Sequence, residues 1–263
     1  MKPYWAHLAA SMRLLLQYRA AAIAGAGTQA FWGIMRMMIF AAFYAGGAGT
    51  APMSLDEVIA YIWLGQAFLV LTPFTGGDRE LTERIRSGMV VFDLLRPVDP
   101  YAYWFSRVLA GRLAPALLRA LPILVLATLA GWLRWPAPAV CGAWLLSMAS
   151  ALLLSSAMVT AMTLSAFWTL SGQGIIQLMA ALSMLLSGLI VPLPLFPAPL
   201  QPLLDLLPFR GLVDIPFRVF TGHVPLTALP SLLAHQAGWT LALALIGRLT
   251  VTRALRRVVI QGG

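Results

Sequence analysis

Long apolar runs are the feature that most limits how this chain can fold. Each run is about 20 residues long, and a helix needs about 20 apolar residues, at 1.5 Å per residue, to cross the hydrocarbon of a bilayer. The runs lie at 20–45, 58–75, 108–133, 137–167, 174–191 and 229–251. We therefore predict an all-α integral membrane protein with six transmembrane helices.

The composition also favours a membrane fold over a soluble one, because 60% of the residues are hydrophobic and only 10% are charged. We treat residues 1–263 as one transmembrane domain. Its predicted segments, in order, are an interfacial helix over 1–19, spans one and two over 20–75, a cytoplasmic loop over 76–107, spans three to five over 108–191, an external stretch over 192–228, span six over 229–251 and a cytoplasmic tail over 252–263.

Basic residues gather on alternate sides of the spans, and Lys and Arg beside a span are retained in the cytoplasm. They precede the first span, lie in the 76–107 loop and follow the last span, whereas the 46–57 loop has none. Both termini and the 76–107 loop are therefore predicted to be cytoplasmic. This topology and the lipid membrane account for the net charge of +9. The chain lacks the continuous basic groove with stacking aromatic residues that would indicate a nucleic-acid partner.

The first 19 residues predict a short helix that lies in the membrane interface. Tyr4, Trp5, Leu8 and Met12 recur at helical spacing, with aromatic residues at the start, as is typical of interfacial helices. Arg13 interrupts the apolar pattern too early for a cleaved signal peptide. The alternative is that these residues are only the beginning of the first span.

The residue types that most catalytic and metal sites require are scarce. Lys2 is the only lysine, so the chain has no P-loop ending in Gly-Lys-Ser or Gly-Lys-Thr. The single cysteine, Cys141, and three scattered histidines do not make a metal site. We predict no catalytic residue, no cofactor and no metal. The chain is then not an enzyme by itself, and any ATP hydrolysis belongs to a partner subunit.

Polar residues in the spans are candidates for a substrate path. Arg119 lies in the third span, and Gln173, Gln177 and Ser187 form a polar stripe along the fifth. Intramembrane charges usually pair or line a wet cavity, while small and polar residues on one face also suit close helix packing. Both interpretations stay open for these four residues. Arg36, in the first span, is expected to extend its side chain toward the outer surface.

The 76–107 loop contains a short charged helix. Asp78 can cap its first turn, Leu81 and Ile85 form one apolar edge, and Gly88 can end it. The sequence Leu-Leu-Arg-Pro-Val-Asp-Pro follows at 94–100, and each proline disfavours helix at the residue before it. We predict a compact element held at the inner membrane surface.

This loop resembles the permease subunits of bacterial type-2 ATP-binding-cassette (ABC) exporters, in which Ile-Arg-Ser-Gly is followed by Leu-Leu-Arg-Pro-Val-x-Pro. Here these segments occupy 85–88 and 94–100. The resemblance implies the bacterial inner membrane, a dimer of separate ATPase subunits as partner, and a second permease subunit, identical or paralogous.

The resemblance also implies that the loop is the coupling helix, which transmits movement of the ATPase to the spans. A small rigid helix can seat in a groove and pass on a rigid-body movement. The residues assigned to ATPase coupling are Glu83, Arg84, Ile85, Arg86, Ser87, Gly88, Arg96 and Pro97. The alternative is a solvated connector that only satisfies the positive-inside rule.

The stretch at 192–228 is too apolar for a solvated loop, yet its prolines prevent one continuous span. Short re-entrant helices buried against protein satisfy both conditions. Phe196, Pro197, Pro208 and Phe209 resemble the corresponding segment of the exporter family, and we assign them to an external gate. Additional half-spans are the alternative.

The sequence thus predicts the permease subunit of an ATP-driven exporter that moves an amphipathic, drug-like, antibiotic or lipid-like molecule out of the cell. One alternative is an ATP-independent channel or secondary carrier, and another is a non-transporting membrane scaffold. A carrier with a carboxylate relay is disfavoured, because every Asp and Glu lies outside the predicted spans or at an edge.

Overall fold

The computed structural model describes residues 9–10, 13, 19–47, 51–74, 76–169 and 173–256. The interfacial helix predicted over 1–19 lies almost entirely outside these residues, as does most of the tail predicted over 252–263. In the described part of the chain, every regular element is a helix. The all-α class is therefore confirmed.

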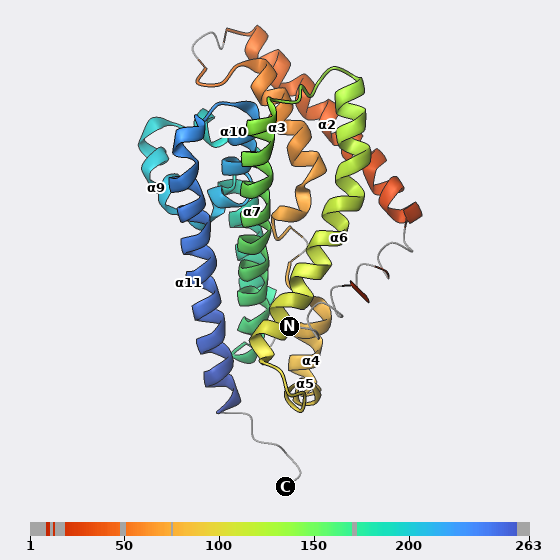
Figure 1. The fold of residues 1–263 in the computed structure, drawn as a ribbon, viewed down its shortest axis with the longest axis vertical. Coiled ribbons are helices and arrows are strands. Elements are labelled where there is room, and N and C mark those ends of the chain that lie inside the picture. Colours follow the sequence, from red (N-terminus) through yellow and green to blue (C-terminus); the bar gives the residue numbers. More distant parts are fainter. Residues whose placement is uncertain are drawn as a thin grey trace.

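The longest helices pack against their neighbours, and the first of them runs obliquely to the rest (Figure 1). They are α2 (Arg19–Ala45), α6 (Pro100–Leu129), α7 (Pro138–Leu164) and α11 (Leu229–Leu255). Among the described residues, three stretches are long and apolar enough to cross a membrane: Pro100–Leu129, Pro138–Phe167 and Leu226–Leu255. They correspond to the third, fourth and sixth predicted spans. A membrane protein is supported, and the full count of six spans stays a prediction.

The second and fifth predicted spans form shorter helices. α3 (Leu55–Ala67) is followed by the 3-10 turn η1 (Leu69–Leu71), and α8 covers Gln173–Leu186. Helices of 13 and 14 residues extend about 20 Å, less than the roughly 30 Å of bilayer hydrocarbon. Most of α3 is buried inside the protein. Its apolar run therefore reflects burial against other helices rather than contact with lipid.

Short helices occupy both ends of the molecule (Figure 1). At one end, α4 (Arg79–Arg86) and α5 (Val91–Leu94) precede α6, whose first two turns lie within the predicted 76–107 loop. The opposite end holds the segments η3 (Leu193–Leu195), η4 (Ala198–Leu200), α9 (Gln201–Leu206), η5 (Pro208–Gly211), α10 (Asp214–Thr221) and η6 (Leu226–Ala228). Many of these begin with proline in the first turn, where the missing N–H has no intrahelical partner to lose.

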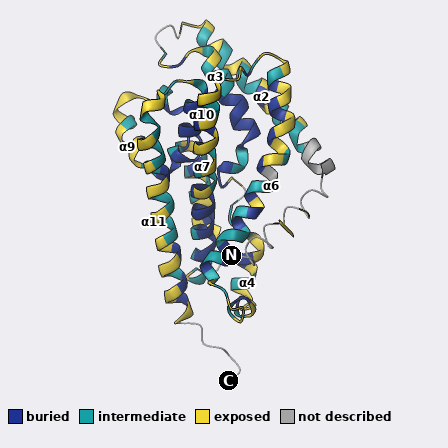
Figure 2. Cartoon of the chain, in the orientation of Figure 1, coloured by how far each residue is buried: buried dark blue, intermediate teal, exposed yellow. Residues whose placement is uncertain are grey.

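α7 is the central helix, with α6 and α11 packed against it (Figure 2). Many of its residues are buried, including Leu154, Met158 and Met162. The core near the α10 end contains an aromatic cluster, in which Trp63 and Trp132 stack at 4.9 Å between ring centroids. A second core cluster lies beneath α4, the 3-10 turn η2 (Ser165–Phe167) and the start of α6.

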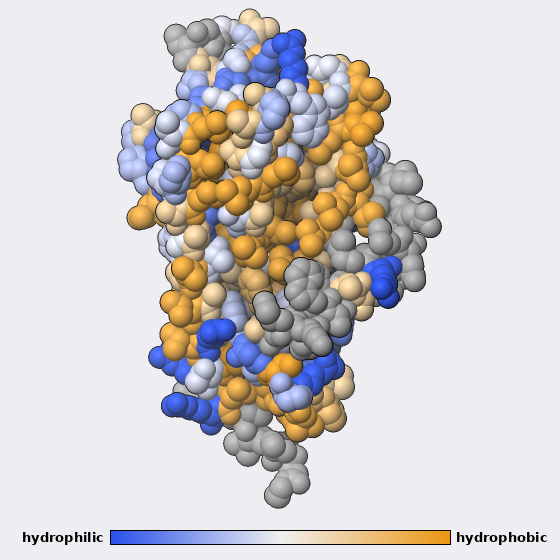
Figure 3. All heavy atoms as spheres, viewed as in Figure 1, coloured by the Kyte–Doolittle hydropathy of each residue, from blue (hydrophilic) through white to orange (hydrophobic). Residues whose placement is uncertain are grey.

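The visible surface is apolar across the middle of the molecule and polar toward both ends (Figure 3). Large apolar side chains are exposed along the long helices, for example Leu121 on α6 and Leu241 and Leu245 on α11. A soluble monomer rarely exposes so extensive an apolar surface. The distribution is that of helices surrounded by lipid, with water at the two ends.

Candidate functional site

The charged helix α4 forms as the sequence predicts. The Asp78 side chain accepts a hydrogen bond from the Leu81 N–H at 3.0 Å, which caps the first turn. Leu81 is buried in the second core cluster, and Ile85 packs against the same cluster. Gly88 ends the turn with φ of +76°, a left-handed conformation that favours glycine. Both ends of α4 and its buried face are therefore determined by residues within or next to the helix.

Two ties connect the start of α4 to the long helices. Arg107 on α6 donates to the Asp78 carboxylate at 2.7 Å and to both carboxylate oxygens of Glu80. The Asp78 N–H donates to Thr163 Oγ1 on α7 at 2.9 Å. The start of α4 is thus joined directly to both α6 and α7.

The hydrogen bonds from Arg107 lower the pKa of the Glu80 carboxyl below its usual value. A depressed folded-state pKa means that the pair contributes fully at neutral pH and loses its contribution as the pH falls through that value. The Glu80 side chain is mostly exposed, so solvent screens this pair. The Asp78 contact, which is more deeply buried, is the firmer tie.

A buried carboxylate holds the rest of the loop together. Asp93, in α5, is 2% exposed. Arg84 donates to its two oxygens at 3.0 and 3.2 Å, and Trp104 Nε1 donates at 3.3 Å. Arg96 donates to the Tyr103 hydroxyl at 2.7 Å and lies over the Tyr103 ring. Arg84 therefore joins α4 to α5, and Arg96 joins the loop to α6.

The outer surface of the loop is free of these contacts and combines charge with exposed apolar groups. Most of the predicted coupling residues are exposed: Glu83, Arg86, Ser87, Gly88, Arg96 and Pro97. Arg84 and Ile85 are partly buried. Beside them, Met89 is 50%, Phe92 64% and Leu95 76% exposed. We call Glu83, Arg86, Ser87, Gly88, Met89, Phe92 and Leu95 the coupling tip.

The predicted substrate-path residues do not lie together. Arg119 lines a cavity of about 430 Å³ between α2, α6 and the segment after η1. Gln173 and Gln177 line a different cavity of about 450 Å³, which they share with Glu83 and Arg86. Ser187 is fully buried at the far end of α8. The structure thus links the two glutamines to the coupling tip and separates them from Arg119.

Arg112, about two turns before Arg119 on α6, is almost completely buried. Its guanidinium donates to the backbone carbonyls of Val70 and Thr72 and to Ser155 Oγ, at 2.9 to 3.1 Å. The two carbonyls belong to η1 and to Thr72, the residue that follows it. Arg112 therefore holds the break after α3 in place and faces the same cavity as Arg119.

The predicted gate residues all belong to the end that carries α9 and α10. Pro208 and Phe209 are buried, Phe196 is partly buried and Pro197 is exposed. The Gln201 side chain donates to the carbonyls of Leu193 and Phe196, at 2.7 and 3.0 Å, and fixes the turns between them. An opening role for this segment stays a prediction.

Beneath this segment lies a polar cluster that the sequence did not reveal. Asp214 is 1% exposed and accepts hydrogen bonds from Tyr61 on α3 and from Arg218, both at 3.3 Å. Arg36 donates to the carbonyls of Leu189 and Ile190, both at 2.6 Å. The Arg36 side chain thus does extend toward this end of the molecule, where it ties α2 to the segment after α8.

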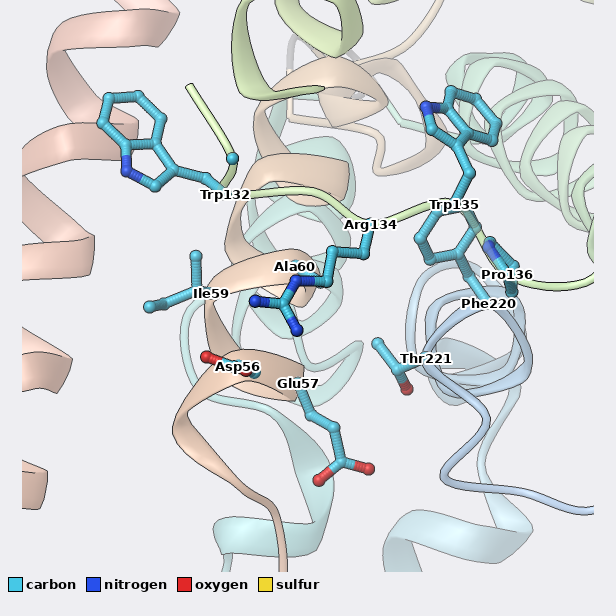
Figure 4. Close-up of a pocket in the computed structure, with 11 residues that line it drawn as sticks. Asp56, Glu57, Ile59, Ala60, Trp132, Arg134, Trp135, Pro136, Phe220 and Thr221 are labelled. Atoms are coloured by element: carbon cyan, nitrogen blue, oxygen red, sulfur yellow. The ribbon is translucent and has the colours of Figure 1, made fainter. Parts of the chain in front are cut away.

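A pocket of about 360 Å³ opens near the same end, between the start of α3 and the turn at 131–136 (Figure 4). Asp56 and Glu57 project from the first turn of α3, and the Arg134 side chain extends toward them (Figure 4). Trp132 and Trp135 provide aromatic walls. Indoles at this level suit a membrane–water boundary.

Comparison with known families identifies the chain. A family model described as an ABC-2 family transporter protein matches residues 30–262. The chain belongs to the ABC-2 transporter family. No curated protein and no solved structure matches it. The resemblance to type-2 ABC permeases that the loop sequence suggested is therefore confirmed.

Membership assigns this ABC-2 chain a general role and a class of partner. It is a membrane component of a transporter rather than a catalytic subunit, and the family implies association with an ABC ATPase. The positions of α4 and α5 at one polar end agree with such an association, because a soluble partner can reach them there (Figures 1 and 3).

Sequence reasoning missed the apolar part of the coupling tip in this ABC-2 chain. Met89, Phe92 and Leu95 recur every three residues in the segment that follows Gly88. That spacing places them on one side of a tight helical turn, and it was a usable signal. No comparable signal marks Asp93 or Asp214 as buried, since their partners lie on other elements or across a turn.

Proposed function

We propose that this ABC-2 chain is the permease subunit of an ATP-driven exporter, and that the coupling tip is its contact with the ATPase. The exporter moves an amphipathic molecule out of the cell, and two permease chains, identical or paralogous, share a dimer of ATPase subunits. The observation that carries the proposal is a tip with an exposed outer surface and an inner side tied to both α6 and α7.

The surface of the coupling tip suits protein contact more than solvent. Phe92 and Leu95 expose apolar area that a partner would bury, at about 25 cal/mol per Å². Glu83 and Arg86 lie beside them and form an exposed ion pair at 3.7 Å. An apolar centre with a charged rim is the usual anatomy of a protein interface.

The orientation supports the same proposal. The coupling tip and the basic end of α11, with Arg248, Arg253 and Arg256, lie at one end of the molecule. The positive-inside rule supports a cytoplasmic location for this end. ATP is available on that side. The α9–α10 end would then be external, where a gate for an exported molecule belongs.

Co-purification with the ATPase tests the proposal. The full chain is co-expressed with the ABC ATPase encoded beside it, and ATPase recovery on the tagged permease is measured. We expect Phe92→Ser with Leu95→Ser to lower recovery at least tenfold, since each side chain buries a hot-spot-sized apolar area in the complex. Replacing Glu83 and Arg86 together by Ala should also weaken recovery, with little effect on folding because exposed ion pairs add about 0–1 kcal/mol.

A matched control is available at the same end of the molecule. Arg253 and Arg256 are exposed charges on α11, outside the coupling tip, so Arg253→Ala with Arg256→Ala should leave recovery unchanged. Equal recovery for the tip variants and wild type would reject the coupling assignment.

A secondary carrier is the second candidate, and Asp214 is the observation in its favour. Ion-coupled carriers use buried carboxylates, and Asp214 is fully buried next to Tyr61. The ion pair between Asp214 and Arg218 also fits a purely structural role for this carboxylate. Uptake into liposomes that contain the permease but no ATPase and no ATP would favour the carrier, whereas strict dependence on ATP would favour the exporter.

A further inference from the structure

The cavity between α2 and α6 has an unusual charge balance for a site inside a membrane protein. Three arginines line it, all from α6, and the lining includes one carboxylate, that of Asp78. Arg107 and Arg119 are 12 residues apart, so the arginines extend about 18 Å from the polar end into the apolar length of α6.

The two deeper arginines are not neutralised by the described residues. Arg107 is paired with Asp78 and Glu80. Arg112 contacts two carbonyl oxygens and one hydroxyl, none of which carries a full negative charge. Arg119 makes no hydrogen bond or ion pair with any residue that the structure describes. Unpaired positive charge at this depth is costly unless an anion or water accompanies it.

The lining also includes apolar side chains, and it is accessible. Leu69, Val70, Phe74 and Val108 face the cavity, and Phe74 is 53% exposed. Gly111 also lines it, and a Cβ atom built there meets nothing within 4 Å. The cavity thus combines three arginines, several apolar side chains and free space at one glycine.

We propose that this cavity binds the anionic headgroup of an amphiphile. Arg119 contacts the phosphate or carboxylate, Arg112 adds attraction, and the hydrocarbon chain lies against Phe74 and Val108. A phosphate or carboxylate is the group that a guanidinium recognises best, through two parallel hydrogen bonds. The same chemistry is offered by a membrane lipid and by an exported amphiphile. Only the second interpretation, as cargo, rests on the proposed function.

Direct binding to the purified full-length chain tests the site without transport. Dodecyl phosphate is titrated into protein held in dodecyl maltoside, a neutral detergent of equal chain length, and followed by calorimetry and native mass spectrometry. We expect one saturable site per chain in wild type. Arg119→Gln should weaken binding at least tenfold, since a hydrogen bond to a charged group contributes about 1.5–3 kcal/mol. Arg119→Lys should recover part of it.

A second variant fills the cavity and leaves its arginines unchanged. Gly111→Leu places a side chain in the cavity and should also weaken dodecyl phosphate binding at least tenfold. Gly142→Leu is its control, because Gly142 on α7 is equally unobstructed and does not line the cavity. Arg134→Gln controls for loss of an exposed arginine elsewhere. Both controls should bind as wild type does, and gel filtration checks that each variant is folded.

Two further arms separate the possible sources of the anion. Inorganic phosphate that binds as tightly as dodecyl phosphate would overturn the amphiphile and leave a site for free anions. Displacement of dodecyl phosphate by phosphatidylglycerol would identify a membrane lipid as the occupant, and failure to displace it would favour cargo. Unchanged affinity in Arg119→Gln and Gly111→Leu together would overturn the site itself.

The two proposals fail in different experiments. The cavity variants leave the coupling tip intact, so they should still recover the ATPase. The tip variants leave the cavity intact, so they should still bind dodecyl phosphate. Retained dodecyl phosphate binding in the cavity variants would therefore overturn the cavity proposal alone, and retained ATPase recovery in the tip variants would overturn the coupling proposal alone.

Discussion

At the scale of single residues, position rather than residue type decides what each arginine of the loop does. Arg84 and Arg86 are two residues apart on α4. Arg84 turns inward to the buried Asp93, while Arg86 lies on the outer surface beside Glu83. We therefore assign Arg84 a structural role and reserve partner contact for Arg86. Replacing Arg84 should therefore lower stability, whereas replacing Arg86 should weaken partner contact.

The buried pair predicts a large effect on stability. Asp93→Ala leaves Arg84 and Trp104 Nε1 without their acceptor and should destabilise the protein by about 2–4 kcal/mol, since loss of one buried partner costs about 3–5 kcal/mol and Arg84 is partly exposed. Unfolding in mixed micelles, followed by tryptophan fluorescence, measures the change. Glu83→Ala, at an exposed position of the same loop, should change stability by less than about 0.5 kcal/mol. Similar losses in both variants would contradict the structural role of Asp93.

The cap of α4 predicts a local effect. Asp78→Ala removes the N-cap, worth about 1 kcal/mol, together with the more deeply buried ion pair of Arg107. We expect faster tryptic cleavage after Arg84 and Arg86 than in wild type. Asp78→Asn retains a capping oxygen and should be cleaved at an intermediate rate. If Asn and Ala gave the same rate, the ion pair with Arg107 rather than the cap would secure α4.

At the scale of elements, local signals predicted some helices well and could not predict others. The bounds of α4 follow from Asp78 and Gly88, because a cap and a left-handed turn depend only on neighbouring residues. The ends of α3 and α8 could not be predicted in this way, because a helix buried in protein and a helix in lipid have similar hydropathy. α3 ends at Ala67. In the turn that follows, the Val70 carbonyl accepts a hydrogen bond from Arg112, which is 42 residues away in sequence.

The same distinction applies to the candidate site. The charged residues of the coupling tip could be found from sequence because a solvated helix has a simple charge pattern. The cavity at Arg119 depends on α2, η1 and α6 meeting, and the burial of Asp214 depends on α3 and α10 meeting. Contacts between distant segments have no signature within either segment alone.

The contact between α11 and α6 gives a prediction at this scale. A Cβ atom on Gly247 would collide with the Tyr101 ring, whereas one on Gly238, on the same helix, meets nothing within 4 Å. Gly247→Ala should cost about 1–3 kcal/mol through overpacking. Gly238→Ala should be neutral or add up to about 1 kcal/mol through helix propensity. Thermal unfolding in detergent compares them, and equal midpoints would show that α11 does not pack on Tyr101.

At the scale of the whole molecule, the two ends differ in chemistry. The α4 end carries exposed charges and the coupling tip, while the α9–α10 end carries proline-started turns, the buried Asp214 and the pocket of Figure 4. Between them lies the apolar middle (Figure 3). Under the positive-inside rule, this asymmetry predicts that the α4 end faces the cytoplasm.

Cysteine labelling checks the orientation. In a Cys141→Ser background, which removes the single native thiol, cysteine is introduced at Ser87 in the coupling tip or at Ala198 in η4, both exposed. A membrane-impermeant maleimide should label Ala198→Cys in intact cells and Ser87→Cys only after permeabilisation. The reverse pattern would invert the topology and remove the ATPase from reach of the tip.

The central place of α7 has a consequence for how this protein tolerates change. The apolar window of the α7 stretch is 56% buried, and that of the α11 stretch only 6%. On α11 most positions need only remain apolar, so one hydrophobic residue can replace another freely. On α7 the side chain must also have the right volume, because neighbours surround it. Homologous permeases should therefore differ widely along α11 while keeping the residue sizes of α7, and a saturation library scored for transport would show the same contrast.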